Sequence, residues 1–154
     1  MNRILNVQWP IKILLAHPQA PFLQQDKFTI AADCVAFSSD NYGKMVGKDE
    51  GVVIGCPLLE DPDKMMSKLA LMIKETSANN INVYTMEVPC CHAIHMMVEK
   101  AINESGKDNI NKNNYIVRVS SGEIEPYNPG VIDDSMIDKE RKVHGHGHGN
   151  GHAC

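Results

Sequence analysis

Five short hydrophobic stretches recur along the chain, and polar or turn-forming residues separate each from the next. They are continuous and rich in β-branched residues, which predicts strands rather than helices. The predicted strands are residues 11–16, 28–32, 51–55, 81–88 and 115–119.

Between the third and fourth predicted strands, hydrophobic residues recur every three or four positions from 61 to 78. Asp61 can cap the helix that this spacing predicts, and Pro62 suits its first position. The same spacing predicts a second helix over residues 92–105, which Gly106 would end. A shorter helix over 39–46 and a polar helix over 133–142 complete the predicted elements.

Strands that alternate with helices indicate crossover connections and therefore a mainly parallel sheet. We expect an α/β fold of three layers, with helices on both faces of the sheet, in a flavodoxin-like or Rossmann-like arrangement. A chain of 154 residues suits one domain, which we assign to residues 1–143. The composition changes abruptly after Val143, so residues 144–154 form a separate tail rich in histidine and glycine.

Composition and charge exclude several classes of protein. Hydrophobic residues make up 43% of the chain and charged residues 22%, with a formal net charge of -4. No basic block is long enough to follow a phosphate backbone, so nucleic acid is not an expected partner. No apolar stretch approaches the roughly 20 residues of a membrane helix, and no signal-peptide pattern opens the chain. We therefore expect a cytoplasmic protein without a membrane partner, and a homo-oligomer is left open.

Four of the five cysteines come just after a predicted strand. Cys34 follows the second strand, Cys56 follows the third, and the pair Cys90 and Cys91 follows the fourth. The carboxyl ends of parallel strands meet at one edge of a sheet, where open α/β folds bind their ligands. Four thiols from three segments are therefore expected to converge there without a short CxxC spacing.

The expected group of thiols suits a soft metal. Thiolates select zinc, copper(I) or iron–sulfur clusters, and helix starts stabilise them. Adjacent Cys90 and Cys91 fit poorly around one small ion, because their side chains tend to diverge, whereas a larger cluster tolerates them. Two alternatives remain. In the first, the thiols are buried apolar side chains. In the second, they take part in thiol chemistry: Cys90 and Cys91 form a disulfide with each other, or one of them acts as a nucleophile.

The segments that contain these cysteines form an ordered set: AADCVAF, VVIGCPLLED and MEVPCC, preceded by QWPIKILLAHPQAPF. Over residues 7–124 this set resembles an iron–sulfur (4Fe-4S) cluster-binding protein family, in which such an α/β domain follows a ferredoxin-like domain. The resemblance implies a [4Fe-4S] cofactor and an anaerobic redox role. The chain has no CxxCxxC motif, so a partner such as a ferredoxin-type protein or an oxidoreductase would supply the electron relay.

Several polar side chains lie near the expected thiols in the sequence. His92 and His95 start the second long helix, and His92 is a candidate fourth ligand or proton donor. We expect His95 to be solvated, because it lies off the apolar face of that helix. His17 is expected in a turn. Asp33 and Glu87 either support the ligands or stabilise their own loops.

The tail carries a second set of metal ligands, in which imidazoles alternate with glycine and the chain ends on a cysteine. Such tails resemble those of nickel-handling accessory proteins and suit nickel or zinc. The alternative is an affinity tail added for purification. The tail ligands are His144, His146, His148, His152 and Cys154.

The leading hypothesis is an iron–sulfur protein that transfers electrons or carries out cluster-based redox chemistry. Its cluster would be held by Cys34, Cys56, Cys90 and Cys91, and if only three bind, the fourth iron is open to a substrate or to His92. A second hypothesis is delivery or storage of nickel or zinc by the tail. A third is a thiol-dependent redox enzyme with Cys90 or Cys91 as nucleophile. Whether the protein is an enzyme stays open.

Overall fold

The computed structural model describes residues 8–38 and 50–128. Its strands are β1 (Lys27–Ala32), β2 (Glu50–Gly55), β3 (Asn80–Met86), β4 (Asn111–Val117) and β5 (Ile124–Pro126). Its helices are the 3-10 helix η1 (Pro21–Leu23) and the α-helices α1 (Asp33–Phe37), α3 (Pro62–Glu75) and α4 (Pro89–Ser105). The helices predicted over 39–46 and 133–142 lie outside the described residues.

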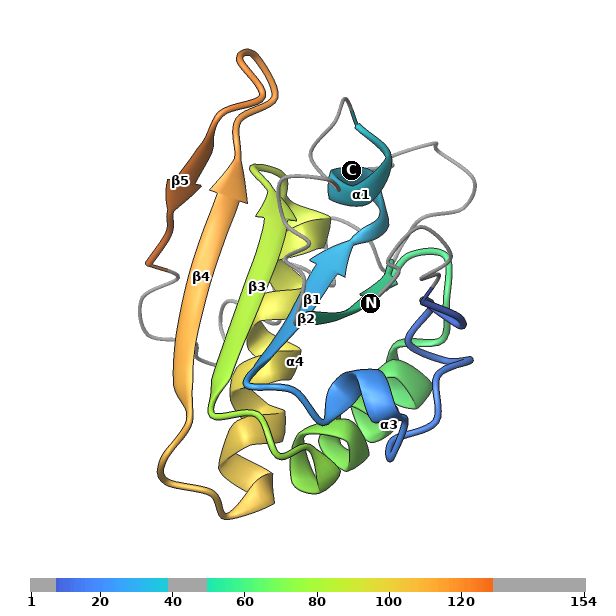
Figure 1. Ribbon diagram of the computed structural model, residues 1–154. Helices are drawn as coiled ribbons and strands as arrows, with labels where there is room; N and C mark the ends of the chain where they lie inside the picture. The colour runs from blue at the N-terminus through green and yellow to red at the C-terminus, as the bar shows by residue number, and fades with distance from the viewer. Residues whose placement is uncertain (1–7, 39–49, 129–154) are drawn as a thin grey trace, which may run out of the picture.

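The five strands form one sheet in the order β2-β1-β3-β4-β5 (Figure 1). β1 pairs in parallel with β2 and with β3, and β3 pairs in parallel with β4. The short β5 is antiparallel to β4. The predicted α/β fold with a mainly parallel sheet is therefore confirmed, and its strand order is the flavodoxin-like one, apart from the direction of β5.

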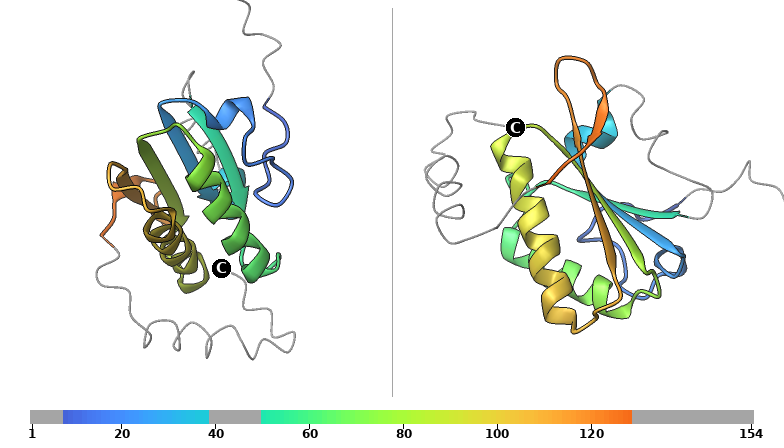
Figure 2. Two further views of the ribbon diagram at one scale, coloured as in Figure 1. Left: turned by 90° about the horizontal axis from the view of Figure 1, so that it is seen from below. Right: turned by 90° about the vertical axis from the view of Figure 1, so that its left-hand side faces the viewer.

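The two long helices lie side by side on one face of the sheet (Figure 2). α3 connects β2 to β3 and α4 connects β3 to β4, so both crossovers step in the same direction along the sheet. Right-handed crossovers in one direction place their helices on the same face. The connection from β1 to β2 steps the other way and contains residues 39–49, so the long helices within the described ranges cover one face rather than both.

The apolar run over residues 11–16 is not a strand, which corrects the first predicted element. Lys12 forms an isolated parallel bridge with Ile54, and the Ile13 amide donates to the Ile54 carbonyl oxygen at 2.9 Å. The chain then turns, because the Ala16 amide donates back to the Lys12 carbonyl oxygen at 3.0 Å. The run is apolar because Ile13 and Ala16 are fully buried. It covers the outer edge of β2 without extending the ladder.

Local sequence signals mark the ends of both long helices. The Asp61 carboxylate accepts hydrogen bonds from two amides of the first turn of α3, at 2.9 and 3.3 Å, which confirms the predicted cap. α4 ends at Gly106, whose φ of 74° is a left-handed conformation that glycine adopts without steric cost. α4 begins at Pro89, before its predicted start, so Cys90 and Cys91 lie in its first turn rather than in a loop.

Two strands were missed wholly or in part by the hydrophobic pattern. β4 begins at Asn111 rather than at residue 115, and β5 lies in a segment for which the sequence predicted neither a strand nor a helix. The side chains of Asn111 and Asn113 are exposed. Pairing with β3, and not burial of apolar side chains, therefore holds the first half of β4 in place.

The core lies between the sheet and the two long helices. At its edge, the backbone of β2 packs closely against that of η1. Gly51 in β2 faces η1, and a Cβ atom there would lie 2.0 Å from the carbonyl oxygen of Phe22. Only glycine allows the two segments to pack this closely. The hydrophobic residues of the long helices with 0% exposure are Met65, Leu69, Met72 and Ile73 of α3 and Ile94, Val98 and Ala101 of α4.

We expect Gly51→Ala to lower the free energy of unfolding by about 3 kcal/mol, because the added methyl group meets backbone rather than a movable side chain. Gly106→Ala is the matched control. A Cβ atom at Gly106 would meet no atom within 4 Å, so left-handed strain alone costs about 1 kcal/mol. Urea unfolding followed by circular dichroism measures both variants, and equal losses would contradict the close packing at Gly51.

Candidate functional site

The carboxyl ends of β1, β2 and β3 form one edge of the sheet, and a cysteine follows each of them. Cys34 lies in α1 after β1, Cys56 directly follows β2, and Cys90 and Cys91 open α4 after β3. The connections that leave β1 and β3 run in opposite directions along the sheet, to β2 and to β4. Such a topological switch point is where open α/β sheets bind ligands. The cysteines therefore lie at the edge that the sequence predicted.

The four thiols at this edge differ in exposure and in bonding. Cys34 is exposed, Cys56 is 8% exposed, and Cys90 and Cys91 are each 1% exposed. Cys34, Cys56 and Cys91 form no disulfide, whereas Cys90 is disulfide-bonded. The vicinal Cys90–Cys91 disulfide, one of the redox alternatives, is therefore not formed. A reagent from solution would reach Cys34 first.

The surroundings of the Cys34 thiol keep it protonated. Partial burial, then Cys56 and then the Asp33 carboxylate raise the pKa of Cys34 above its ordinary value. The expectation that a helix start stabilises the thiolate does not hold for Cys34, because α1 has only 5 residues and negative groups lie close by.

A lysine holds the two cysteine-bearing segments together. The Lys12 ammonium donates to the Asp33 carboxylate at 2.6 Å and forms an ion pair with Glu60. Burial by itself would lower the pKa of Lys12, but the two carboxylates outweigh it and raise the pKa. Asp33 precedes Cys34, and the Glu60 amide donates to the Cys56 carbonyl oxygen at 2.9 Å. We call this group the Lys12–Asp33–Glu60 clamp.

A complete metal-binding set is not assembled in the part of the chain that the structure describes, where no three His, Cys, Asp or Glu side chains could hold an ion. Oδ1 of Asp33 and Oε2 of Glu60 are buried and make no hydrogen bond there. The donors present suit a soft metal, and binding would require the thiols to turn toward one another. The predicted tail ligands His144, His146, His148, His152 and Cys154 lie outside the described ranges.

His92 and Tyr127 border a cavity at the carboxyl ends of β3 and β4. Its volume is about 350 Å³, and the rest of its lining is Thr85, Met86, Glu87, Val88 and Ile116. Nδ1 of His92 lies 3.1 Å from the Tyr127 hydroxyl, and burial lowers the pKa of His92, which favours the neutral ring. Nε2 of His92 is buried and makes no hydrogen bond with the described residues. His92, the predicted ligand or proton donor, therefore has one ring nitrogen without a hydrogen-bond partner among the described residues.

His95 is fully buried, so the prediction of a solvated side chain is wrong. Its Nδ1 lies 3.1 Å from Oδ1 of Asn114 on β4, and its Nε2 lies 2.7 Å from the Thr85 hydroxyl on β3. An acceptor at Nδ1 and a hydroxyl donor at Nε2 together favour one neutral tautomer. Burial, which the bond to Asn114 offsets only in part, lowers the pKa of His95 to about 4.

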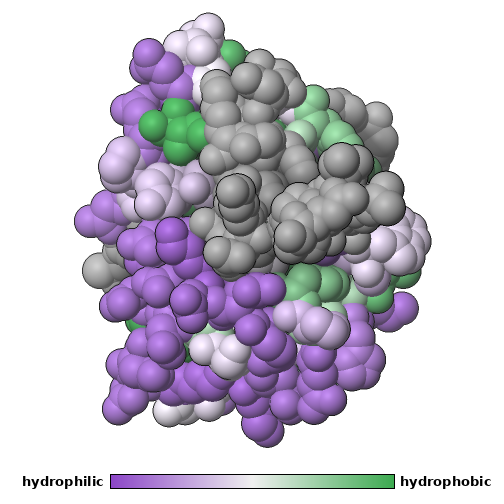
Figure 3. Space-filling model, viewed as in Figure 1, coloured by the Kyte–Doolittle hydropathy of each residue, from purple (hydrophilic) through white to green (hydrophobic). Residues whose placement is uncertain are grey.

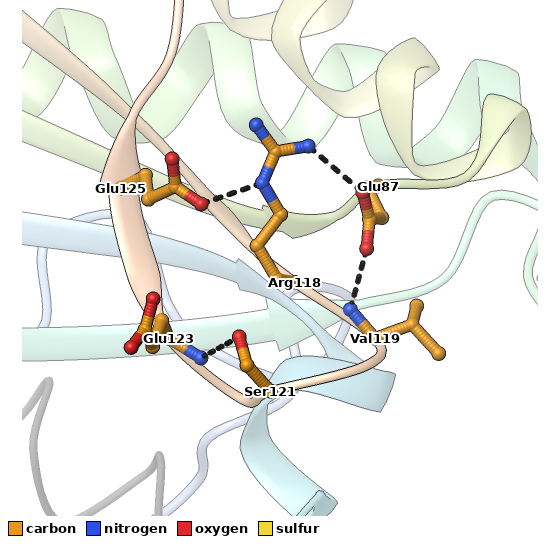
Figure 4. A network of polar contacts seen from close by, with 6 residues as sticks. All are labelled: Glu87, Arg118, Val119, Ser121, Glu123 and Glu125. Atoms are coloured by element: carbon orange, nitrogen blue, oxygen red, sulfur yellow. Dashed lines mark hydrogen bonds and ion pairs between the residues drawn. The ribbon is translucent and has the colours of Figure 1, made fainter.

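Glu87 stabilises the loop at the end of β3 (Figure 4). Its carboxylate accepts hydrogen bonds from Nη1 of Arg118 at 2.8 Å and from the Val119 amide at 2.6 Å. Nε of Arg118 donates to Glu125 at 2.6 Å, so one guanidinium joins the ends of β3, β4 and β5. Arg118 is also the main cause of the lowered pKa of Glu87. Of the two roles predicted for Glu87, the contacts support stabilisation of its loop.

The surface of the described residues is mainly hydrophilic on the face drawn in Figure 3. Phe37, Leu59 and Val119 are exposed hydrophobic side chains in segments that follow β1, β2 and β4. His17 is exposed, and its Nδ1 accepts a hydrogen bond from the Gln19 amide at 3.1 Å, as expected of a turn residue. No helix within the described ranges is long and apolar enough to cross a membrane.

Comparison with known proteins agrees with this architecture. The family profile of a Rossmann-like domain matches residues 20–150. The chain belongs to the Rossmann-like domain family. A protein of Archaeoglobus fulgidus, named only as uncharacterized, is 51% identical over 140 residues, which cover 90% of this chain and 96% of that protein. No solved structure gives a significant match to this Rossmann-like domain.

The buried His95 makes the stability of this Rossmann-like domain depend on pH. The folded protein protonates His95 only near pH 4, whereas the unfolded chain protonates it near 6.5, so acid favours unfolding. Through this group, the free energy of unfolding should fall by about 2 kcal/mol between roughly pH 7.5 and pH 5. His95→Gln should remove this part of the pH dependence, measured by urea unfolding at each pH. His17→Gln, at an exposed histidine, is the control, and an unchanged slope in His95→Gln would sink the prediction.

Proposed function

We propose that this Rossmann-like domain binds a metal cofactor through cysteine thiolates at the carboxyl edge of its sheet, with a [4Fe-4S] cluster as the favoured form. The observation that carries the proposal is that three adjacent parallel strands, β2, β1 and β3, are each followed closely along the chain by a cysteine. Thiolates are the ligands that iron–sulfur clusters use. Neither comparison names a cofactor, so the proposal rests on these side chains and on the motifs that contain them.

Each thiol has a distinct part in the proposed site. Cys34 and Cys56 would bind first, because the Lys12–Asp33–Glu60 clamp holds their segments side by side. Cys91 in the first turn of α4 would be the third ligand, and Cys90 the fourth once its disulfide is reduced. The amino end of α4 favours the negative charge of thiolates. If only three cysteines bind, His92 is the next donor along the helix.

The cavity beside α4 supports a role in redox chemistry on a small molecule as well as in electron transfer. Val88 and His92 line this cavity, and Cys90 and Cys91 lie between them in the sequence. A bound [4Fe-4S] cluster would supply one-electron transfer at this edge. The protein would position a small molecule in this cavity, against the neutral imidazole of His92 and the hydroxyl of Tyr127. Its redox partner would be a ferredoxin-type protein or an oxidoreductase in the cytoplasm.

The test is the iron, acid-labile sulfide, nickel and zinc content of the full chain, purified and reconstituted without oxygen. We expect iron and sulfide in near-equal amounts, together with a broad visible absorption band. Cys56→Ser should lose most of both, because it removes a ligand that lies beside the clamp. Ala78→Ser is the matched control: it makes a similarly small change at a buried position just before β3, at the other end of the sheet, and should keep both.

Two results would count against this proposal. Folded protein that holds neither iron nor sulfide would contradict a cluster of any type. Nickel or zinc without sulfide would mean that the thiols or the tail handle metal ions, and it would overturn the [4Fe-4S] form. Circular dichroism of each preparation shows whether the protein is folded.

A further inference from the structure

Cys34 and Cys56 follow neighbouring strands at the same level of the sheet. Ala32 of β1 pairs with Gly55 of β2, so Asp33 and Cys56 continue from a paired position. Parallel strands lie about 4.8 Å apart, and disulfides join cysteines whose Cα atoms lie roughly 4.4–6.8 Å apart. Cys34 follows Asp33 and lies in the first turn of α1, and α1 contacts both β1 and β2. The backbone therefore places Cys34 one residue beyond the position that continues opposite Cys56 on the neighbouring strand.

The Lys12–Asp33–Glu60 clamp holds the same two segments through separate contacts. One cation binds the residue before Cys34 and the turn that follows Cys56. The side chains of Asp33 and Glu60 are only 14% and 13% exposed, so solvent screens these ion pairs weakly. Segments that are already fixed side by side lose little further entropy when their thiols meet.

The two thiols differ in access to solvent, and both are available to react. Cys34 is exposed, whereas Cys56 is 8% exposed. A small oxidant therefore reaches Cys34 first. Cys56 is the nearby thiol that can then attack the Cys34 sulfur and displace the group bound to it. Neither cysteine is in a disulfide in the structure.

We propose that Cys34 and Cys56 form a reversible dithiol–disulfide pair at the carboxyl edge of the sheet. A base from solution takes the proton of the Cys34 thiol, and the sulfur attacks a small disulfide, RSSR, whose S–S bond breaks and releases one RS⁻. The Cys56 thiolate then attacks the Cys34 sulfur of the mixed disulfide, forms the Cys34–Cys56 bond and releases the second RS⁻. The two cysteine protons end on two RSH, so the protein loses two electrons and the small disulfide gains them.

This pair goes beyond the proposed cofactor site and has a consequence for it. Oxidation would remove two thiolates from the edge where a soft metal would bind, because a disulfide sulfur no longer carries the negative charge of a thiolate. Metal binding and disulfide formation would therefore oppose each other. Either property can be present without the other.

The test uses the full chain, reduced with a phosphine, freed of metal by a chelator and equilibrated anaerobically with mixtures of oxidised and reduced glutathione. Remaining thiols are alkylated, and the peptides are mapped by mass spectrometry. We expect a linked peptide that joins Cys34 to Cys56, and Cys34→Ser and Cys56→Ser should each abolish it. Cys91→Ser removes a buried thiol outside the pair and should retain the linked peptide.

Two outcomes would overturn the pair. One is alkylation of both Cys34 and Cys56 in every glutathione mixture, in protein that circular dichroism shows to be folded. The other is linkage of either cysteine to a different partner in place of the expected one. Because the protein is free of metal throughout, neither outcome depends on the metal content measured for the proposed function, and the two proposals fail separately.

Substitution of Lys12 tests the cause of the pairing. Lys12→Met should lower the equilibrium constant for the disulfide about tenfold, because the two segments lose their shared cation. Lys12→Arg keeps the charge and should retain most of the constant, and Lys64→Met, on the exposed first turn of α3, should leave it unchanged. Equal constants in folded Lys12→Met and in the unsubstituted protein would show that the clamp does not position the thiols.

Discussion

The parallel pairing of β1 with both β2 and β3 is the constraint on which the rest of the structure depends. It sets three carboxyl ends side by side and so brings cysteines from three distant segments to one edge. Because the chain steps from β1 to β2 in one direction and from β3 to β4 in the other, that edge is also a topological switch point. The antiparallel β5 lies at the far margin of the sheet and leaves this arrangement intact.

The Lys12–Asp33–Glu60 clamp adds ion pairs to the strand pairing, between the segments that carry Cys34 and Cys56. Charges shielded from water are costly to desolvate, and their attraction offsets the cost only when each charge has well-placed partners. Lys12 has two such partners, and its raised pKa shows that they outweigh burial. The clamp is therefore better understood as a device that fixes position than as a source of stability. It fixes the residue before one cysteine and the turn after another.

Polar contacts within the core hold the amino-terminal half of α4. His95 joins the helix to Thr85 on β3 and to Asn114 on β4, and His92 contacts Tyr127 beyond β5. Cys90 and Cys91 therefore lie at the start of a helix that contacts β3, β4 and the residue after β5, whereas the exposed Cys34 lies on a helix of 5 residues.

The sequence by itself determined the features that depend on neighbouring positions: the strands that precede the cysteines, the cap at Asp61, and the placement of thiols at strand ends. It misassigned residues 11–16, because a buried apolar run packs on a sheet edge as well as within a ladder. It missed the burial of His95 and the ion pairs of Lys12, whose partners are distant along the chain. Only the pairing of strands brings those partners within hydrogen-bonding distance, and no local pattern of hydrophobic and polar residues encodes which strands will be neighbours.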